Sequence, residues 1–166
     1  TGWVDKLEEV ETMFAKNSTP FFYASNFSIG VFISRATLKY LSNLLSQHPE
    51  YKGELKEWHH TAKLDAPSGT AISMAEDVLD NHVEYEQIAF EKKSLAAGDF
   101  PVSSYREGNI PGTHEIIFES DVDKIQLRHE AKNRDGFAKG ALRAAEFLVG
   151  QEPRTYTMND LINISL

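Results

Sequence analysis

The chain has 166 residues, no cysteine and a formal net charge of −8 at pH 7. This length suffices for one sizeable hydrophobic core, and the lack of cysteine excludes disulfides and thiolate chemistry and is typical of a cytoplasmic protein. The acidic balance disfavours a nucleic-acid partner, and no apolar run approaches the length needed to span a membrane.

The first residues predict one helix and one short strand. Residues 20–25 form an apolar run of strand character. Apolar side chains at helical spacing precede it, namely Trp3, Leu7, Val10 and Phe14. One helix and one strand bury little apolar surface by themselves, so we expect them to have belonged to a larger sheet.

A long helix is predicted over residues 28–45, ending before Pro49. Its apolar side is expected to comprise Phe32, Ala36, Tyr40, Leu41 and Leu44. Residues 55–60 have strand character, so adjacent His59 and His60 at the end should point to opposite faces.

The segment from Glu57 to Ala71 contains several residues of types that act in catalysis or ligand binding. Two histidines, a lysine and an aspartate precede a Pro-Ser-Gly-Thr turn that opens a predicted helix over residues 68–80. Ser68 suits the N-cap, and Gly69 lets a ligand approach the backbone closely. Because free N–H groups at a helix start attract anions, the pattern indicates a histidine acid beside a site for carboxylate or phosphate.

The second half of the chain is dominated by short strands. Residues 83–98 form a charged connection to which the sequence assigns no element. Strands are predicted at 102–106, 115–120 and 124–129, with a hairpin connection at 121–123. The last strand alternates so that Ile125, Leu127 and His129 share a face expected to be buried.

A final helix is predicted before Gly150, and an apolar tail over residues 154–166 is expected to dock on the protein. The apolar stripe of the helix comprises Phe137, Ala141, Ala144, Ala145 and Leu148.

Residues 57–71 resemble the motif E-x-H-H-x-x-K-x-D-A-P-S-G-T-A of the 4-hydroxy-tetrahydrodipicolinate reductase family, also called dihydrodipicolinate reductases. Residues 24–31 resemble its A-x-N-F-S-x-G-V segment. Further blocks that resemble the family lie at residues 1–3, 106–108, 111–114 and 129–138. The blocks keep the family's order over nearly the whole chain.

The resemblance implies an α/β chain, α+β in its main domain. The family begins with a Rossmann half whose G-x-G-x-x-G loop binds the cofactor pyrophosphate, and this sequence has no such loop. We therefore expect that half to be missing. Residues 1–27 would be the end of the dinucleotide-binding domain. Residues 28–150 would be a substrate-binding and oligomerisation domain with a mixed sheet flanked by helices, and residues 151–166 a tail returning to the first domain.

The resemblance also implies an activity, the reduction of 4-hydroxy-tetrahydrodipicolinate by NADPH or NADH in lysine and diaminopimelate synthesis, by a cytoplasmic homotetramer. His59 would be the general acid, since histidine carries a transferable proton near neutral pH, and Lys63 a second donor. The carboxylates of this small dicarboxylate substrate would be bound by His60, Ser68, Gly69 and Thr70.

The resemblance places the cofactor near the residues Thr1, Ala24, Ser25, Asn26, Phe27 and Arg134. Phe27 offers a flat apolar surface to the nicotinamide ring, although a phenylalanine that opens a helix is usually part of a core. Arg134 is equally compatible with a surface salt bridge. The residue that selects NADH or NADPH would lie in the missing part.

Three alternatives come from other functional classes. Ser68 and Lys63 could form a Ser–Lys acyl-transfer site, but capping already explains the serine. A metal site would draw on His59, His60, His114 and His129, but adjacent strand histidines diverge and H-x-H or H-x-x-x-H spacing is lacking, so we predict none. The chain could also be a non-catalytic substrate-binding or assembly fragment.

Overall fold

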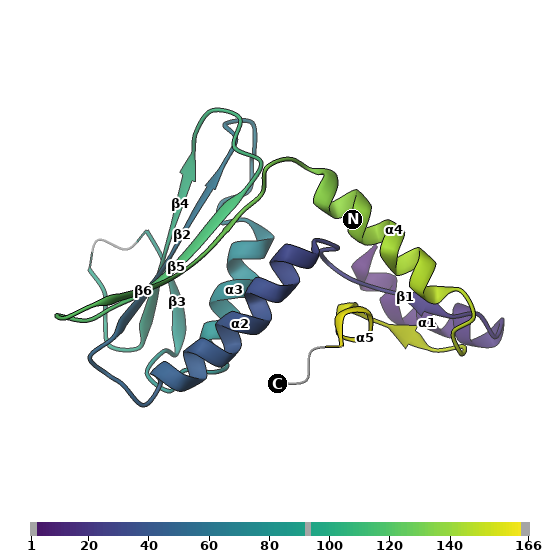
Figure 1. Cartoon of the computed structure of the whole chain (residues 1–166), viewed down its shortest axis with the longest axis horizontal. Helices are drawn as coiled ribbons and strands as arrows, with labels where there is room; N and C mark the ends of the chain where they lie inside the picture. Colours follow the sequence, from purple (N-terminus) through teal and green to yellow (C-terminus); the bar gives the residue numbers. More distant parts are fainter. Residues whose placement is uncertain (1–2, 92–93, 164–166) are drawn as a thin grey trace. The chain divides into compact units, whose positions relative to one another are not determined.

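The structure is a computed structural model that describes residues 3–91 and 94–163. The chain forms two compact units. The first consists of the segments up to Ile29 and from Asp135 onward, and the second of Gly30–Arg134. Their elements are labelled in Figure 1.

The second unit contains a five-stranded mixed sheet with the strand order β3-β4-β2-β5-β6. Its strands are β2 (Lys52–His59), β3 (Gln87–Phe90), β4 (Asp99–Arg106), β5 (Thr113–Glu119) and β6 (Lys124–Glu130). The central strand β2 pairs in parallel with β4 and antiparallel with β5. The edge strands continue this pattern, because β3 is parallel to β4 and β6 antiparallel to β5. The mixed sheet expected from the sequence is confirmed.

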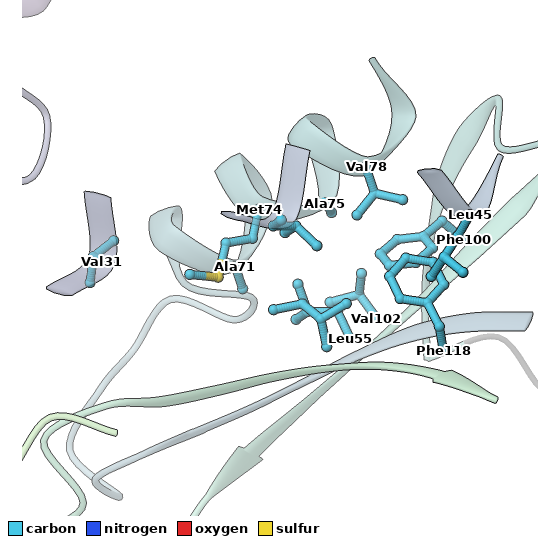
Figure 2. Close-up of a cluster of buried hydrophobic side chains, with 12 residues drawn as sticks. Val31, Leu45, Leu55, Ala71, Met74, Ala75, Val78, Phe100, Val102 and Phe118 are labelled. Carbon is cyan, nitrogen blue, oxygen red and sulfur yellow. The ribbon is translucent and has the colours of Figure 1, made fainter. Parts of the chain in front are cut away.

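Helices α2 (Ile29–Leu45) and α3 (Gly69–Leu79) cover one face of this sheet (Figure 1). Alternate residues of each strand point toward the helices. Figure 2 shows side chains of α3 above those of the sheet. The core cluster includes Leu38, Leu55, Met74, Val78, Phe100, Val102, Ile116 and Phe118. Each fully buried large apolar side chain contributes about 1.5–3 kcal/mol, so this layer holds the start of α3 in place against the sheet.

The buried side of α2 differs from the predicted one. Tyr40 and Leu44 are 56% and 47% exposed. The buried positions are Val31, Leu38, Ser42 and Leu45. Apolar residues occur around much of this helix, so its periodicity permits more than one face. Packing against the sheet selects the face that includes a polar serine.

The strand boundaries also required correction. The segment 83–98, left unassigned from the sequence, contains β3, which is only four residues long. Strand β4 begins at Asp99, three residues before the predicted start, and includes Pro101. Proline cannot donate to a sheet and therefore argues against a strand in sequence. In β6 Leu127 packs against the core, whereas Ile125 is partly exposed.

The first unit is built from short elements. They are a 3₁₀ turn (Val4–Lys6), α1 (Leu7–Lys16), β1 (Phe21–Phe22), α4 (Asp135–Leu148), β7 (Thr155–Tyr156) and α5 (Met158–Ile162). Strand β7 pairs in parallel with β1, so the C-terminal tail docks on the N-terminal segment. Since α4 belongs to this unit, the segment 28–150 expected to form one domain spans both units.

Aromatic contacts hold the first unit together. The ring of Phe22 lies 5.7 Å from Phe27 and 6.3 Å from Phe147. A Cβ at Gly140 of α4 would lie 1.8 Å from the carbonyl oxygen of Phe27, so only glycine permits this approach. None of the helices in the described ranges has the length and apolar character needed to traverse a bilayer.

Candidate active site

The site begins with the alternation of β2. Glu57 and His59 lie on the same face as core residue Leu55, and their exposed fractions are 0% and 8%. His60 follows the end of the strand and is only partly buried. A carboxylate without solvent contact must be paired, because desolvation of an isolated charge costs several kcal/mol.

Glu57 is paired on both oxygens. Its Oε1 accepts hydrogen bonds from the backbone N–H of Ser68 at 3.1 Å and from Nη2 of Arg106 at 2.9 Å. Its Oε2 contacts Nδ1 of His59. Burial by itself would raise the pKa of Glu57, but the hydrogen bonds from His59 and Arg106 outweigh it and hold the pKa well below the ordinary value. The carboxylate is therefore ionised at neutral pH.

The sheet register explains this convergence. His59 is the cross-strand partner of Arg106 on β4, and Glu57 is the cross-strand partner of His114 on β5. Cross-strand partners present their side chains on the same face. The N-terminus of α3 adds Ser68 to that face, because the helix packs on the same side of the sheet.

Ser68 and His114 lie next to the Glu57–His59 pair. The Oγ of Ser68 accepts from the N–H of Ala71 at 3.1 Å, which confirms the predicted N-cap, and lies 3.2 Å from Nε2 of His114. Burial, followed by the nearby charge of His59, lowers the pKa of His114 to about 4. His114 is consequently neutral at pH 7. Its ring meets that of His59 edge to face, with 5.2 Å between centroids.

Fewer backbone N–H groups are available at the predicted anion-binding turn than the sequence suggests. Glu57 uses the N–H of Ser68, and the Ser68 side chain uses the N–H of Ala71. Gly69 is exposed, and a Cβ added there would meet no atom within 4 Å. The turn therefore has its open backbone position at Gly69, the first residue of α3.

Lys63 lies in the connection between β2 and α3. Its Nζ is 2.8 Å from both carboxylate oxygens of Asp65, and this contact is the main cause that lowers the pKa of Asp65. Arg106 fastens the same connection through a 2.6 Å hydrogen bond to the carbonyl of Asp65. Lys63 and Asp65 therefore form an ion pair in this connection.

His60 and Arg134 meet at a separate hollow of about 440 Å³. It is lined by His60, Thr61, Ala62, Asn109, Pro111, Lys132, Asn133 and Arg134. Nη2 of Arg134 lies 3.0 Å from Nε2 of His60. Because a guanidinium can only donate, Nε2 of His60 is the acceptor in this contact. The hollow combines two cationic side chains with a histidine, which suits an anionic ligand.

The remaining residues predicted for the cofactor belong to the first unit or fall outside the described ranges. Asn26 caps the following turn, since its Oδ1 accepts from the N–H of Ser28 at 2.8 Å. Phe27 packs on Phe22 and is part of that unit's core. Ala24 is partly buried and Ser25 exposed. Thr1 lies outside the described residues.

Glu57 and Arg106 were not predicted as site residues from the sequence, and His114 was considered only as a possible metal ligand. Glu57 could have been found by its position, because a charged residue on the apolar face of a strand needs a buried partner. The arginine and the second histidine become neighbours only through the sheet register, which one sequence does not specify.

Glu57, His59 and His114 each offer an atom that could ligate a metal, and these atoms lie within 4.8 Å of one another. However, both oxygens of Glu57 already accept hydrogen bonds or contact a ring nitrogen, and Arg106 would face any cation at this position. The arrangement therefore suits a hydrogen-bonded acid–base pair better than a metal. His60, considered with them from the sequence, instead contacts Arg134.

Comparisons with known proteins agree on one family. A family model described as "Dihydrodipicolinate reductase, C-terminus" matches residues 30–162. A 4-hydroxy-tetrahydrodipicolinate reductase of Christiangramia forsetii is 36% identical over 163 residues, covering 98% of this chain and 67% of that protein. One from Rickettsia bellii is 41% identical over 159 residues, covering 92% and 61%. The chain thus spans about two thirds of the length of these relatives.

Among solved structures, a dipicolinate-bound dihydrodipicolinate reductase from a Paenisporosarcina species has a TM-score of 0.66 and 24% identity to this chain. The match covers 92% of this chain and 58% of that one. It supports the fold.

Proposed function

This chain belongs to the dihydrodipicolinate reductase family, and on that basis we propose that the full product of its gene reduces 4-hydroxy-tetrahydrodipicolinate to tetrahydrodipicolinate in lysine and diaminopimelate synthesis. The observation that carries the proposal is the ionised Glu57 held against His59 beside the exposed start of α3. A histidine acid next to an anion-binding turn is what reduction of an unsaturated cyclic dicarboxylate requires.

His59 is proposed as the general acid that delivers a proton to the reduced ring. A ring carbon accepts a proton poorly without a positioned donor, and general acid catalysis contributes about 10²–10⁴-fold. Lys63 is proposed as the second donor, which assists loss of the hydroxyl group or stabilises charge at the ring nitrogen and carboxylate. Its present partner Asp65 is exposed and is readily exchanged.

The substrate carboxylates are proposed to bind at two places. One is the start of α3, where Gly69 and Thr70 present backbone and Ser68 fixes the turn. The other is the cationic hollow beside His60. The name of the Paenisporosarcina protein records bound dipicolinate, a planar pyridine dicarboxylate, which is the kind of ligand these positions suit.

A nicotinamide cofactor, NADPH or NADH, would supply the hydride. The sequence has no Gly-rich loop for the pyrophosphate, so the chain's own residues fit only the nicotinamide end of the cofactor. For this end we propose Thr1, Ala24, Ser25, Asn26 and Phe27, together with Arg134. Exposed Ser25 is the member of this set best placed to meet a ligand, since Phe27 packs on Phe22.

We further propose a cytoplasmic homotetramer assembled through the open face of the sheet in the second unit. Trp58 and Tyr105 stack on this face with 5.1 Å between ring centroids, and Tyr105 is 42% exposed. Exposed aromatic residues on a sheet face are common at subunit interfaces.

The proposal is tested with the full gene product, freshly generated 4-hydroxy-tetrahydrodipicolinate and each nicotinamide cofactor in turn. Cofactor oxidation that depends on substrate and is inhibited competitively by dipicolinate is the expected result. Failure to oxidise either cofactor by a folded protein that still binds dipicolinate would instead favour the non-catalytic substrate-binding alternative.

The Ser–Lys hydrolase receives no support from the contacts of the two residues. Nζ of Lys63 binds Asp65, while Oγ of Ser68 is engaged with Ala71 and His114. A serine nucleophile needs its hydroxyl in contact with the base.

A further inference from the structure

The contact between Glu57 and His59 has features that packing alone does not require. An apolar residue at position 57 would suit the face that β2 shares with the core, and burying a carboxylate there is costly. The cost is offset by donors from three parts of the chain: Arg106 on β4, the N–H of Ser68 at the start of α3 and Nδ1 of His59.

The other ring nitrogen of His59, Nε2, lies beside the backbone of Gly112. A Cβ at Gly112 would lie 3.1 Å from Nε2 of His59, and Gly112 has a φ of +156°. Glycine therefore leaves room beside Nε2 and adopts a backbone conformation that other residues rarely use. The ring has a carboxylate at Nδ1 and a side-chain-free backbone at Nε2.

We propose that Glu57 is a positioning residue: its carboxylate keeps one ring proton of His59 on Nδ1, so that the proton given to the substrate is the one on Nε2. The same carboxylate accepts from Ser68 and Arg106, and so fixes the acid relative to the substrate-binding turn. This inference rests on the proposed reductase function.

The electrostatic surroundings agree with this role. The low pKa of Glu57 keeps it charged, so a carboxylate anion lies against Nδ1 of His59. Arg106 on β4 and His114 on β5 lie next to the Glu57–His59 pair, and the charge of Lys63 in the connection after β2 acts on His114. His114 is neutral and Arg106 is bound to Glu57, so Glu57 is the anion in contact with the acid.

The position of the proton is tested first in this chain, without cofactor or substrate. A nitrogen-15 NMR experiment on histidine side chains should show a strongly deshielded proton on Nδ1 of His59. The signal should be absent in His59→Gln and Glu57→Gln, and present in His60→Gln. A native chain in which neutral His59 carries its proton on Nε2, with Nδ1 bare, overturns the proposal whatever the variants do.

The catalytic consequence is tested in the full gene product. Glu57→Gln should lower kcat about 10- to 100-fold with little change in KM, a part of the roughly 10²–10⁴-fold due to a positioned acid. A change in the pH dependence of kcat should accompany this loss, because the anion in contact with the ring is removed. Glu57→Asp, which retains the charge, should restore most of both. Glu54→Gln on the opposite face of β2 is the matched control and should match the wild type.

The outcomes separate the two claims. An active wild-type enzyme whose Glu57→Gln variant keeps its kcat and pH profile overturns the positioning role and leaves the reductase assignment intact. An inactive wild type that retains the Nδ1 proton signal overturns the assignment, while the geometry stands. If Glu57→Gln fails to fold, the native NMR signal and the Glu57→Asp profile decide.

Discussion

At the scale of the residue, the site is a set of side chains whose protonation is fixed by burial and by their neighbours. Glu57 is buried but charged, because three donors surround it. His114 is neutral, because burial and then the nearby charge of His59 lower its pKa to about 4. The cluster therefore combines a charged carboxylate and a neutral imidazole on neighbouring strands, and His59, the proposed acid, contacts both.

His114 makes folding stability depend on pH. Its pKa is lowered to about 4 in the folded chain, against about 6.5 when unfolded. A depressed folded pKa means that this stability is complete above about pH 6.5 and is lost as the pH falls through about 4. The loss is on the order of 3 kcal/mol. Urea denaturation between about pH 7.5 and pH 4 should show it, and His114→Gln should flatten the slope. Equal slopes for both proteins would contradict a buried neutral His114.

At the scale of the element, the most consequential part is the start of α3, which brings a capping serine and an exposed glycine to the end of β2. Sequence patterns predicted this helix and its Ser68 cap correctly, because both depend on local chemistry. The mixed sheet was expected from the family resemblance. The patterns gave the wrong face of α2 and missed β3, because these depend on which strands become neighbours. The contact between Glu57 and Arg106 was missed for the same reason, since it joins residues 49 positions apart.

Substitutions at Gly69 and Ser68 should affect substrate binding and folding stability differently. Gly69→Ala adds a Cβ into open space at a helical position, so stability should be unchanged or rise by up to about 1 kcal/mol. The same methyl group blocks close approach of a carboxylate, so KM should rise about tenfold. Ser68→Ala should instead lower stability by about 1 kcal/mol through loss of the cap. Thermal denaturation and steady-state kinetics of both variants check this pattern. A Gly69→Ala enzyme with native KM would place the carboxylate elsewhere.

At the scale of the whole molecule, the chain comprises two units. The first joins the N-terminal and C-terminal segments through the pairing of β1 with β7, and the second contains the mixed sheet. The family match over residues 30–162 covers all of the sheet-containing unit and most of the C-terminal segment. The residues proposed as the acid and the anion-binding turn, and the cationic hollow, all lie in the sheet-containing unit. We therefore place substrate chemistry there, and expect cofactor affinity to depend on parts of the relatives that this chain does not span.

This sequence contains no Gly-rich loop to bind the cofactor pyrophosphate, so we predict that the chain alone binds dinucleotides weakly. Pyrophosphate needs convergent backbone N–H groups, and a net charge of −8 opposes its approach. Calorimetric titration with NADPH should detect no binding in the micromolar range for the chain, and micromolar binding for the full gene product. Micromolar affinity of the chain alone would show that its own residues suffice for the cofactor.

The central claim is that His59 in this chain is the proton donor of a reductase, and turnover of the His59→Gln variant tests it most directly. In the full gene product this change should lower kcat by about 10²–10⁴-fold and leave KM nearly unchanged, because a general acid acts mainly in the transition state. Binding of NADPH and dipicolinate should persist. A His59→Gln enzyme that turns over at the wild-type rate would contradict the account.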